Sequence, residues 1–394
     1  MRDALEPQLR LVRMSLALAF IAGLLLSRRL WLTSPRFYPT APLLEVLAPL
    51  AYPLDYALFA MLLGALALSA FAPRAEVFVV AACLITVFLM ACDQTRWQPW
   101  AYQYLLMLAA LVVPAPRTPP DATKTLDVKL DACRLIIAAI YFWSGWQKVN
   151  YNFSADVLPN LMQSYVGALP DAWRRLPTYA GALVPVVEVF TGVGLLFKRT
   201  RGAAVVTALA AHCFIMLLFV PVGRNTVIWP WNMAMACFVI ILFWGERDFS
   251  LKRAFALRRS TAHALIAALV VVMPLFNFVG LWDSYLSAAL YAGNTRVAEL
   301  RMDAETARRL PPQVQRVVTK KDDGSLSLNL GRWSYAELNV PAYPETRVLR
   351  VVARRVCAEA TDASQVVLEI KERPRLIDGS RRTTTQTCAE LDAP

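Results

Sequence analysis

Three ionisable side chains lie where the sequence is otherwise apolar. Glu188 and His212 each fall in the middle of an apolar stretch, and Lys148 falls near the end of another. Ionisable groups are costly inside a bilayer and tend to face the protein interior or a water-filled cavity. A lysine that is desolvated beside an apolar cavity can act as a base near neutral pH. We therefore predict that Lys148 is a catalytic base and that Glu188 and His212 relay protons or orient a substrate.

Further polar and aromatic residues gather at the ends of the same apolar stretches. They are Asp93, Arg96 and Gln98 after one stretch, Trp143 near the end of another, and Arg224 and Asn232 around a third. We predict that this set forms the mouth of an outward-facing polar cavity and contacts a cofactor there.

Each of these residues also has a purely structural interpretation. Lys148 can extend its ammonium group to the lipid headgroups, and Asp93 and Arg96 can form a local ion pair. Glu188 and His212 can form a buried structural pair, and the many Trp and Tyr residues can form an interfacial aromatic belt. The sequence leaves both interpretations open.

The absence of known catalytic and metal-binding motifs leaves several other kinds of chemistry without support. The chain has no P-loop, GxSxG, HExxH or GxGxxG motif in a suitable context. Its seven cysteines show no CxxC or Cys/His metal spacing, so no metal site is expected.

The composition indicates what kinds of domain must position these residues. Of the 394 residues 57% are hydrophobic and 18% are charged, whereas soluble proteins average about 25% charged residues. The last 104 residues hold 31 of the 70 charged residues. We therefore expect a mainly α, polytopic membrane domain over residues 1–282 and a small, β-rich soluble domain over 283–394.

Hydropathy predicts about nine membrane-spanning helices, each near the length of about 20 residues that a bilayer requires. The predicted spans are 11–31, 54–73, 75–92, 100–115, 132–149, 179–198, 202–221, 227–244 and 262–282.

The distribution of basic residues predicts the orientation of these spans. The loop 198–201 and the segment 247–259 are the most basic short connections, and such loops face the cytoplasm. This places the N-terminus in the cytoplasm and the C-terminal domain outside, in a multi-pass protein of the bacterial inner membrane. Of the net charge of +12, +3 lies in the last 104 residues and +9 in the membrane part, where the basic residues lie between apolar runs. We interpret this excess as a topology signal and expect no nucleic-acid partner. The outer loop that carries Arg28, Arg29 and Arg36 does not fit this pattern.

The C-terminal 112 residues carry their own local signals. The segments 346–353 and 365–372 are rich in β-branched residues and predict strands. Asp303 precedes a short helical pattern and is expected to cap it. Cys357 and Cys388 could pair in an oxidising compartment or remain as two free thiols.

The pattern Tyr141-Phe142-x-x-Gly145-x-x-Lys148-Val149, with Phe153 after it, resembles the horizontally transferred transmembrane (HTTM) domain of vitamin K-dependent gamma-carboxylases. The resemblance covers roughly residues 90–245. It implies a carboxylase or quinol-epoxidase type of lyase, with Lys148 abstracting a proton from vitamin K hydroquinone or another quinol. It also implies a periplasmic protein or peptide as substrate.

Two other kinds of function remain compatible with the sequence. One is a non-catalytic membrane scaffold whose tail docks a periplasmic protein, or a quinone-linked redox subunit that resembles the DoxX type. The other is transport, although the sequence shows neither the inverted repeats nor the paired broken spans that are typical of transporters.

Overall fold

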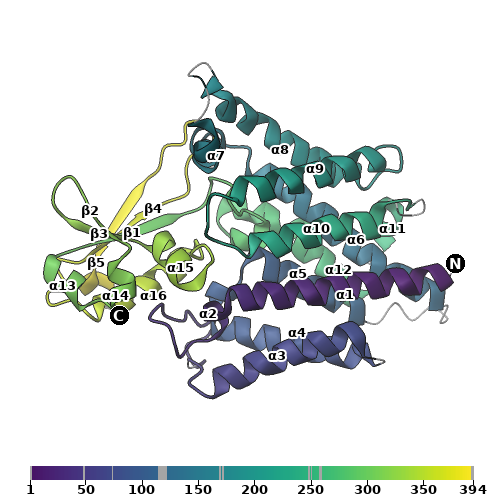
Figure 1. The fold of residues 1–394 in the computed structure, drawn as a ribbon, viewed down its shortest axis with the longest axis horizontal. Coiled ribbons are helices and arrows are strands. Elements are labelled where there is room, and N and C mark those ends of the chain that lie inside the picture. The colour runs from purple at the N-terminus through teal and green to yellow at the C-terminus, as the bar shows by residue number, and fades with distance from the viewer. Residues whose placement is uncertain are drawn as a thin grey trace.

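The computed structural model describes residues 2–47, 49–72, 74–113, 122–167, 170, 173–246, 249, 251–256 and 260–391. The chain forms a bundle of long helices followed by a C-terminal region of five short strands and several short helices (Figure 1). The predicted fold class, a mainly helical membrane bundle with a small sheet, is therefore confirmed. Part of the basic segment used for orientation, residues 247, 248, 250 and 257–259, lies outside the described residues.

In the part of the chain that the structure describes, six helical segments are long and apolar enough to cross a membrane. They make the chain a multi-pass membrane protein. They are α1 (Arg2–Leu26), α3 (Leu54–Phe71), α4 (Ala75–Cys92), α8 (Leu176–Gly194), α9 (Arg201–Phe219) and the run Thr261–Val279, which comprises α12 (Thr261–Ala267), η5 (Ala268–Val272) and η6 (Met273–Val279).

The three other predicted spans also coincide with helices, but these differ in character. They are α5 (Pro99–Val112), α6 (Ala122–Gln147) and α10 (Ile228–Phe243). Ten of the 14 residues of α5 are buried, against six of the 18 residues of α3. Other helices rather than lipid therefore cover most of α5. Whether these three segments also cross the bilayer stays a prediction.

Short elements connect and extend the bundle. They are α2 (Arg28–Trp31), η1 (Gln94–Arg96), η2 (Phe153–Val157), α7 (Leu158–Val166), α11 (Leu251–Ala256) and η7 (Tyr285–Ser287). The N-terminus and the C-terminal sheet lie at opposite ends of the bundle (Figure 1). Which of these ends faces the cytoplasm stays a prediction.

Two glycines bring α6 and α8 into close contact. A Cβ atom on Gly145 would lie 2.7 Å from the backbone oxygen of Pro185, and one on Gly192 would lie 2.5 Å from the backbone nitrogen of Phe142. Small residues at such contacts let helix backbones approach closely in membrane proteins. This contact sets the separation of the side chains that α6 and α8 direct into the bundle.

The C-terminal sheet is antiparallel, with strand order β2-β3-β1-β4-β5. The strands are β1 (Val297–Met302), β2 (Val318–Lys320), β3 (Leu326–Asn329), β4 (Val367–Lys371) and β5 (Thr383–Thr387). The helices beside them are α13 (Ala304–Arg309), α14 (Pro312–Gln315), α15 (Leu330–Leu338), α16 (Thr346–Cys357) and α17 (Cys388–Leu391). The strand predicted at 365–372 is confirmed as β4. Asp303 caps α13 as expected, since its carboxylate accepts from the backbone nitrogens of Glu305 and Thr306.

The strand predicted at 346–353 is wrong, because this segment forms the amphipathic helix α16. Its buried residues are Val348, Leu349, Val352, Ala353, Val356 and Cys357. Their spacing of three and four residues matches one face of a helix and not the alternation of a strand. Tertiary packing of that face outweighs the strand preference of the individual valines.

Of the two states left open for the C-terminal cysteines, the structure shows the disulfide. Cys357 at the end of α16 is bonded to Cys388 at the start of α17, with their Cα atoms 5.5 Å apart. The bond joins α16 to the end of the strand pair β4–β5.

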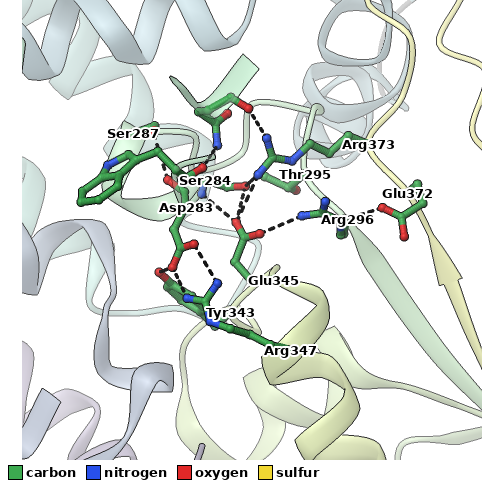
Figure 2. A network of polar contacts seen from close by, with 12 residues as sticks. Asp283, Ser284, Ser287, Thr295, Arg296, Tyr343, Glu345, Arg347, Glu372 and Arg373 are labelled. Carbon is green, nitrogen blue, oxygen red and sulfur yellow. Dashed lines mark hydrogen bonds and ion pairs between the residues drawn. The ribbon is translucent and has the colours of Figure 1, made fainter. Parts of the chain in front are cut away.

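A charged network joins the bundle to the C-terminal region (Figure 2). The buried Glu345 carboxylate accepts hydrogen bonds from the backbone nitrogen and hydroxyl of Ser284 at 2.8 Å, and forms ion pairs with Arg296 at 2.7 Å and Arg373 at 3.3 Å. A second cluster, centred on Asp283, lies beside it. These contacts hold the connection that follows η6 against the region that carries the sheet.

Candidate functional site

A cavity of about 400 Å³ lies among α6, α8, α9 and α10 and extends to η2 and α7. Most of its lining side chains are apolar, and they come from all of these elements. The polar lining residues are Tyr141, Ser144, Lys148, Glu188, Thr191, Thr207, His212, Trp231, Asn232 and Tyr291. A volume of this order, with apolar walls and few polar groups, is typical of small-molecule binding sites.

Lys148 and Glu188 form an ion pair inside this cavity. Lys148 Nζ donates to Glu188 Oε2 at 2.7 Å, and also to the backbone oxygen and Oγ of Ser144 at 3.1 and 2.6 Å. These three bonds use all three hydrogens of the ammonium group. Glu188 Oε1, in contrast, accepts no hydrogen bond from the described residues, so it is available as an acceptor.

Tyr141, His212 and Asn232 form a second polar group in the cavity wall. Asn232 Nδ2 donates to the backbone oxygen of Ile228, which leaves its Oδ1 to accept from His212 Nδ1 at 2.8 Å. His212 therefore carries a hydrogen on Nδ1, and its Nε2 accepts the hydroxyl hydrogen of Tyr141. The phenol oxygen of Tyr141 keeps a lone pair for another donor.

The two polar groups lie along one face of α6. Tyr141, Ser144 and Lys148 follow a spacing of three and four residues, which places them on the same side of a helix. Seven residues separate Tyr141 from Lys148, which corresponds to about 10 Å along the helix axis. The ammonium group of Lys148 reaches back to Ser144, however, so the Glu188 carboxylate lies only about one helical turn from Tyr141 on the cavity wall.

The α8–α9 side of the cavity reaches the lipid-facing surface of the bundle. Leu183 on α8 and Phe214 on α9 line the cavity, yet 61% and 41% of their surfaces are exposed. Ala210 on α9 also lines the cavity and is exposed. Because these residues lie within spans, their exposed surfaces face the hydrocarbon of the membrane.

The structure brings together the three residues predicted to be catalytic, and Asn232 with them. Lys148, Glu188, His212 and Asn232 all line the same cavity. Their chemical roles stay predictions.

Asp93, Arg96 and Gln98 lie elsewhere and do not line the cavity. Asp93 is fully buried and pairs with Arg36, and Arg96 donates to the backbone oxygens of Leu30, Trp31 and Leu89. These bonds fasten the end of α4 to the segment after α1. The pairing with Asp93 also neutralises Arg36, one of the three arginines that do not fit the predicted topology.

The remaining residues of the predicted mouth also lie outside the cavity. Gln98 donates to the backbone oxygens of Thr95 and Pro341. Trp143 borders a much smaller neighbouring cavity and donates to the backbone oxygen of Val271 at 3.2 Å. The guanidinium group of Arg224 lies over the ring of Tyr335, 5.2 Å from its centroid.

Sequence reasoning missed two functional candidates, Tyr141 and Ser144. Their helical spacing from Lys148 was the signal that could have identified them. In the part of the chain that the structure describes, no group of three or more His, Cys, Asp or Glu side chains could hold a metal ion.

The fold and the cavity define the class of this protein: a multi-pass helical membrane protein with a largely apolar cavity in its helical bundle and a C-terminal sheet region. The family model described as methylamine utilisation protein MauE matches residues 126–226. The match covers about a quarter of the chain and includes Lys148, Glu188 and His212. No curated protein and no solved structure matches the chain.

This match corrects the resemblance to the HTTM domain of the gamma-carboxylases. The segment that carried that resemblance matches the MauE model instead. The Tyr-Phe-x-x-Gly-x-x-Lys pattern has a local explanation, because Gly145 is required by the close contact of α6 with α8. The carboxylase assignment is therefore withdrawn.

Proposed function

We propose that the cavity binds a lipid-soluble quinol, and that the protein accepts protons from it at Glu188 and Tyr141. The observation that carries this proposal is the pair of available acceptors, Glu188 Oε1 and the Tyr141 oxygen, on the wall of one largely apolar cavity. A quinol ring carries hydroxyl donors at opposite positions and apolar faces between them.

The cavity suits such a ligand in size, polarity and access. Its volume of about 400 Å³ accommodates a substituted ring and the first part of an isoprenoid tail. The lipid-facing side at Leu183 and Phe214 provides a path by which a ligand dissolved in the bilayer enters without crossing water.

The residues of the cavity are arranged to hold protons at defined atoms. Glu188 can take a proton at Oε1 while Lys148 holds its other oxygen in place. Tyr141 can take a proton at its oxygen while its own hydrogen passes to His212 Nε2, and Asn232 fixes the histidine tautomer that makes this possible. When bound, a quinol would supply two protons to these atoms, and an oxidised redox partner protein would take its two electrons. In this arrangement the role of Lys148 is to position Glu188. Lys148 can act as a base only after its ammonium group has given a proton to the Glu188 carboxylate.

We propose the inner membrane as the location, with the C-terminal region outside the cytoplasm and facing a periplasmic protein. The basic loop 198–201 supports this orientation.

A non-catalytic scaffold or redox subunit is the second candidate function. The C-terminal region supports it, because the sheet projects beyond the end of the bundle (Figure 1). Retention of a periplasmic protein by variants that no longer bind quinol would favour this candidate.

A binding titration tests the quinol proposal. A short-chain quinol and the matching quinone are titrated anaerobically against the protein in nanodiscs, with quenching of tryptophan fluorescence as the signal. We expect saturable quenching, most of it lost in Trp231→Phe because Trp231 lines the cavity. The quinol should bind several-fold more tightly than the quinone, and Glu188→Gln and Tyr141→Phe should each reduce that preference.

The matched control is Glu76→Gln, since Glu76 is an exposed partner of Lys129 outside the cavity. Quenching that never saturates, or equal affinities for both redox forms, would overturn the proposal.

A further inference from the structure

The connection between β4 and β5 carries the most exposed large apolar side chain that the structure describes. Ile377, in the turn of this hairpin, is 92% exposed, and its neighbour Leu376 is nearly half exposed. The turn is well ordered by its own bonds: Arg375 and Ser380 pair through their backbones, and Asp378 accepts from Ser380. The apolar tip is therefore held out by a defined turn.

The hairpin is fastened to the end of the bundle. The backbone nitrogen of Tyr151, four residues beyond the end of α6, donates to the backbone oxygen of Leu376 at 2.9 Å. Arg381 donates to the backbone oxygens of Gly293, Thr295 and Glu372. The hairpin runs toward α7 at the edge of the bundle (Figure 1). Its tip therefore lies beside the end of α6.

Exposed apolar residues continue from the bundle to this tip. Val149 and Tyr151, which follow α6, are each more than half exposed. The hairpin adds Leu376 and Ile377 to the same area through the bond to Tyr151. At the end of a predicted membrane span such residues are expected in the interfacial layer of the bilayer.

The charge of the hairpin complements a lipid surface. Two exposed arginines, Arg375 and Arg382, flank the tip, whose own acidic residue is Asp378. Arg373 and Glu372 belong to the network around Glu345, and Arg381 binds backbone oxygens. Apolar side chains surrounded by basic ones are typical of segments that insert shallowly among anionic headgroups.

We propose that the β4–β5 hairpin is a membrane anchor: Leu376 and Ile377 insert into the interfacial layer, and Arg375 and Arg382 contact anionic phospholipid headgroups. The anchor holds the C-terminal region against the bilayer at the edge of the bundle. It is independent of the ligand proposed for the cavity.

Spin-label accessibility tests this proposal in the full chain. Ile377→Cys is labelled with a nitroxide in a background that lacks Cys83, Cys213 and Cys237, the free cysteines that are not buried. The labelled protein is placed in vesicles with and without anionic phospholipid. The matched control is Asp322→Cys, in the exposed turn between β2 and β3. Collisions with oxygen and with a water-soluble nickel chelate are measured at each position.

We expect the ratio of oxygen to nickel collisions to be several-fold higher at position 377 than at 322, and higher in anionic than in zwitterionic vesicles. Arg375→Gln with Arg382→Gln should remove most of the dependence on anionic lipid. Equal ratios at both positions in both kinds of vesicle would overturn the proposal. A label at 377 that is shielded only after addition of a periplasmic extract would also overturn it and would identify the tip as a protein-docking site.

Discussion

The Lys148 ammonium group donates a 2.7 Å hydrogen bond to Glu188 and so ties α6 to α8 inside the cavity. Because Ser144 takes the other two hydrogens of the ammonium group, Lys148 has no donor left for a ligand. Glu188 keeps one oxygen free, and so it is the member of the pair that can meet a hydroxyl group.

The first prediction concerns the stability of this pair. Lys148→Met leaves the Glu188 carboxylate without its partner in a largely apolar cavity, which should cost about 3–5 kcal/mol. The double variant Lys148→Met with Glu188→Leu should recover most of that loss. Thermal unfolding in nanodiscs measures both, with the exposed Lys252→Met as control. If the single and double variants unfold at the same temperature, the pair does not stabilise the cavity.

A second prediction concerns the contact between α6 and α8. Gly145→Ala places a methyl group 2.7 Å from backbone atoms of α8, which the helices can relieve only by moving apart. We expect a loss of about 1–3 kcal/mol in stability and weaker quinol binding. Gly64→Ala in α3 is the control, since a Cβ there meets nothing within 4 Å, and it should be neutral or stabilise by up to about 1 kcal/mol. Equal effects of the two substitutions would refute the importance of this contact.

A third prediction separates structural from functional charges. Asp93→Asn removes the carboxylate that faces Arg36 and Arg96, both of which are buried, and should lower stability by about 3–5 kcal/mol. Quinol affinity of the folded protein should change less than twofold, because Asp93 does not line the cavity. A large loss of quinol affinity at unchanged stability would contradict this prediction and show that Asp93 contributes to binding.

A fourth prediction concerns the disulfide. Thiol titration of the denatured protein should give five free cysteines before reduction and seven after it. Replacing Cys357 and Cys388 with serine should destabilise the C-terminal region by about 2–4 kcal/mol, and limited proteolysis should then cut that region faster than the bundle. Seven free thiols without reductant would contradict the bond.

Hydropathy was sufficient to locate the helices of the bundle, because burial in lipid requires long apolar runs whatever their partners are. It was not sufficient to separate helices that face lipid from α5, which other helices cover. The error at α16 has a different origin. Valine favours strands, but the period of the buried residues was helical, and that period was the better guide.

The site was partly predictable for a similar reason. Ionisable residues in the middle of apolar stretches, Glu188 and His212, do line the cavity, as does Lys148. Asp93 and Arg96 lie near helix ends, where backbone oxygens and neighbouring charges can satisfy them, and the structure uses them in that way. The sequence could not show which depth and which side of the bundle each residue faces.

The most direct test of the central proposal is the quinone content of the protein extracted with its native lipids. Wild type and the control Glu76→Gln should retain about one quinone per chain, well above the content expected from the lipid that surrounds them. The double variant Glu188→Gln with Tyr141→Phe should fall to that lipid level. A wild-type protein that carries no more quinone than its lipid would contradict the assignment of the cavity.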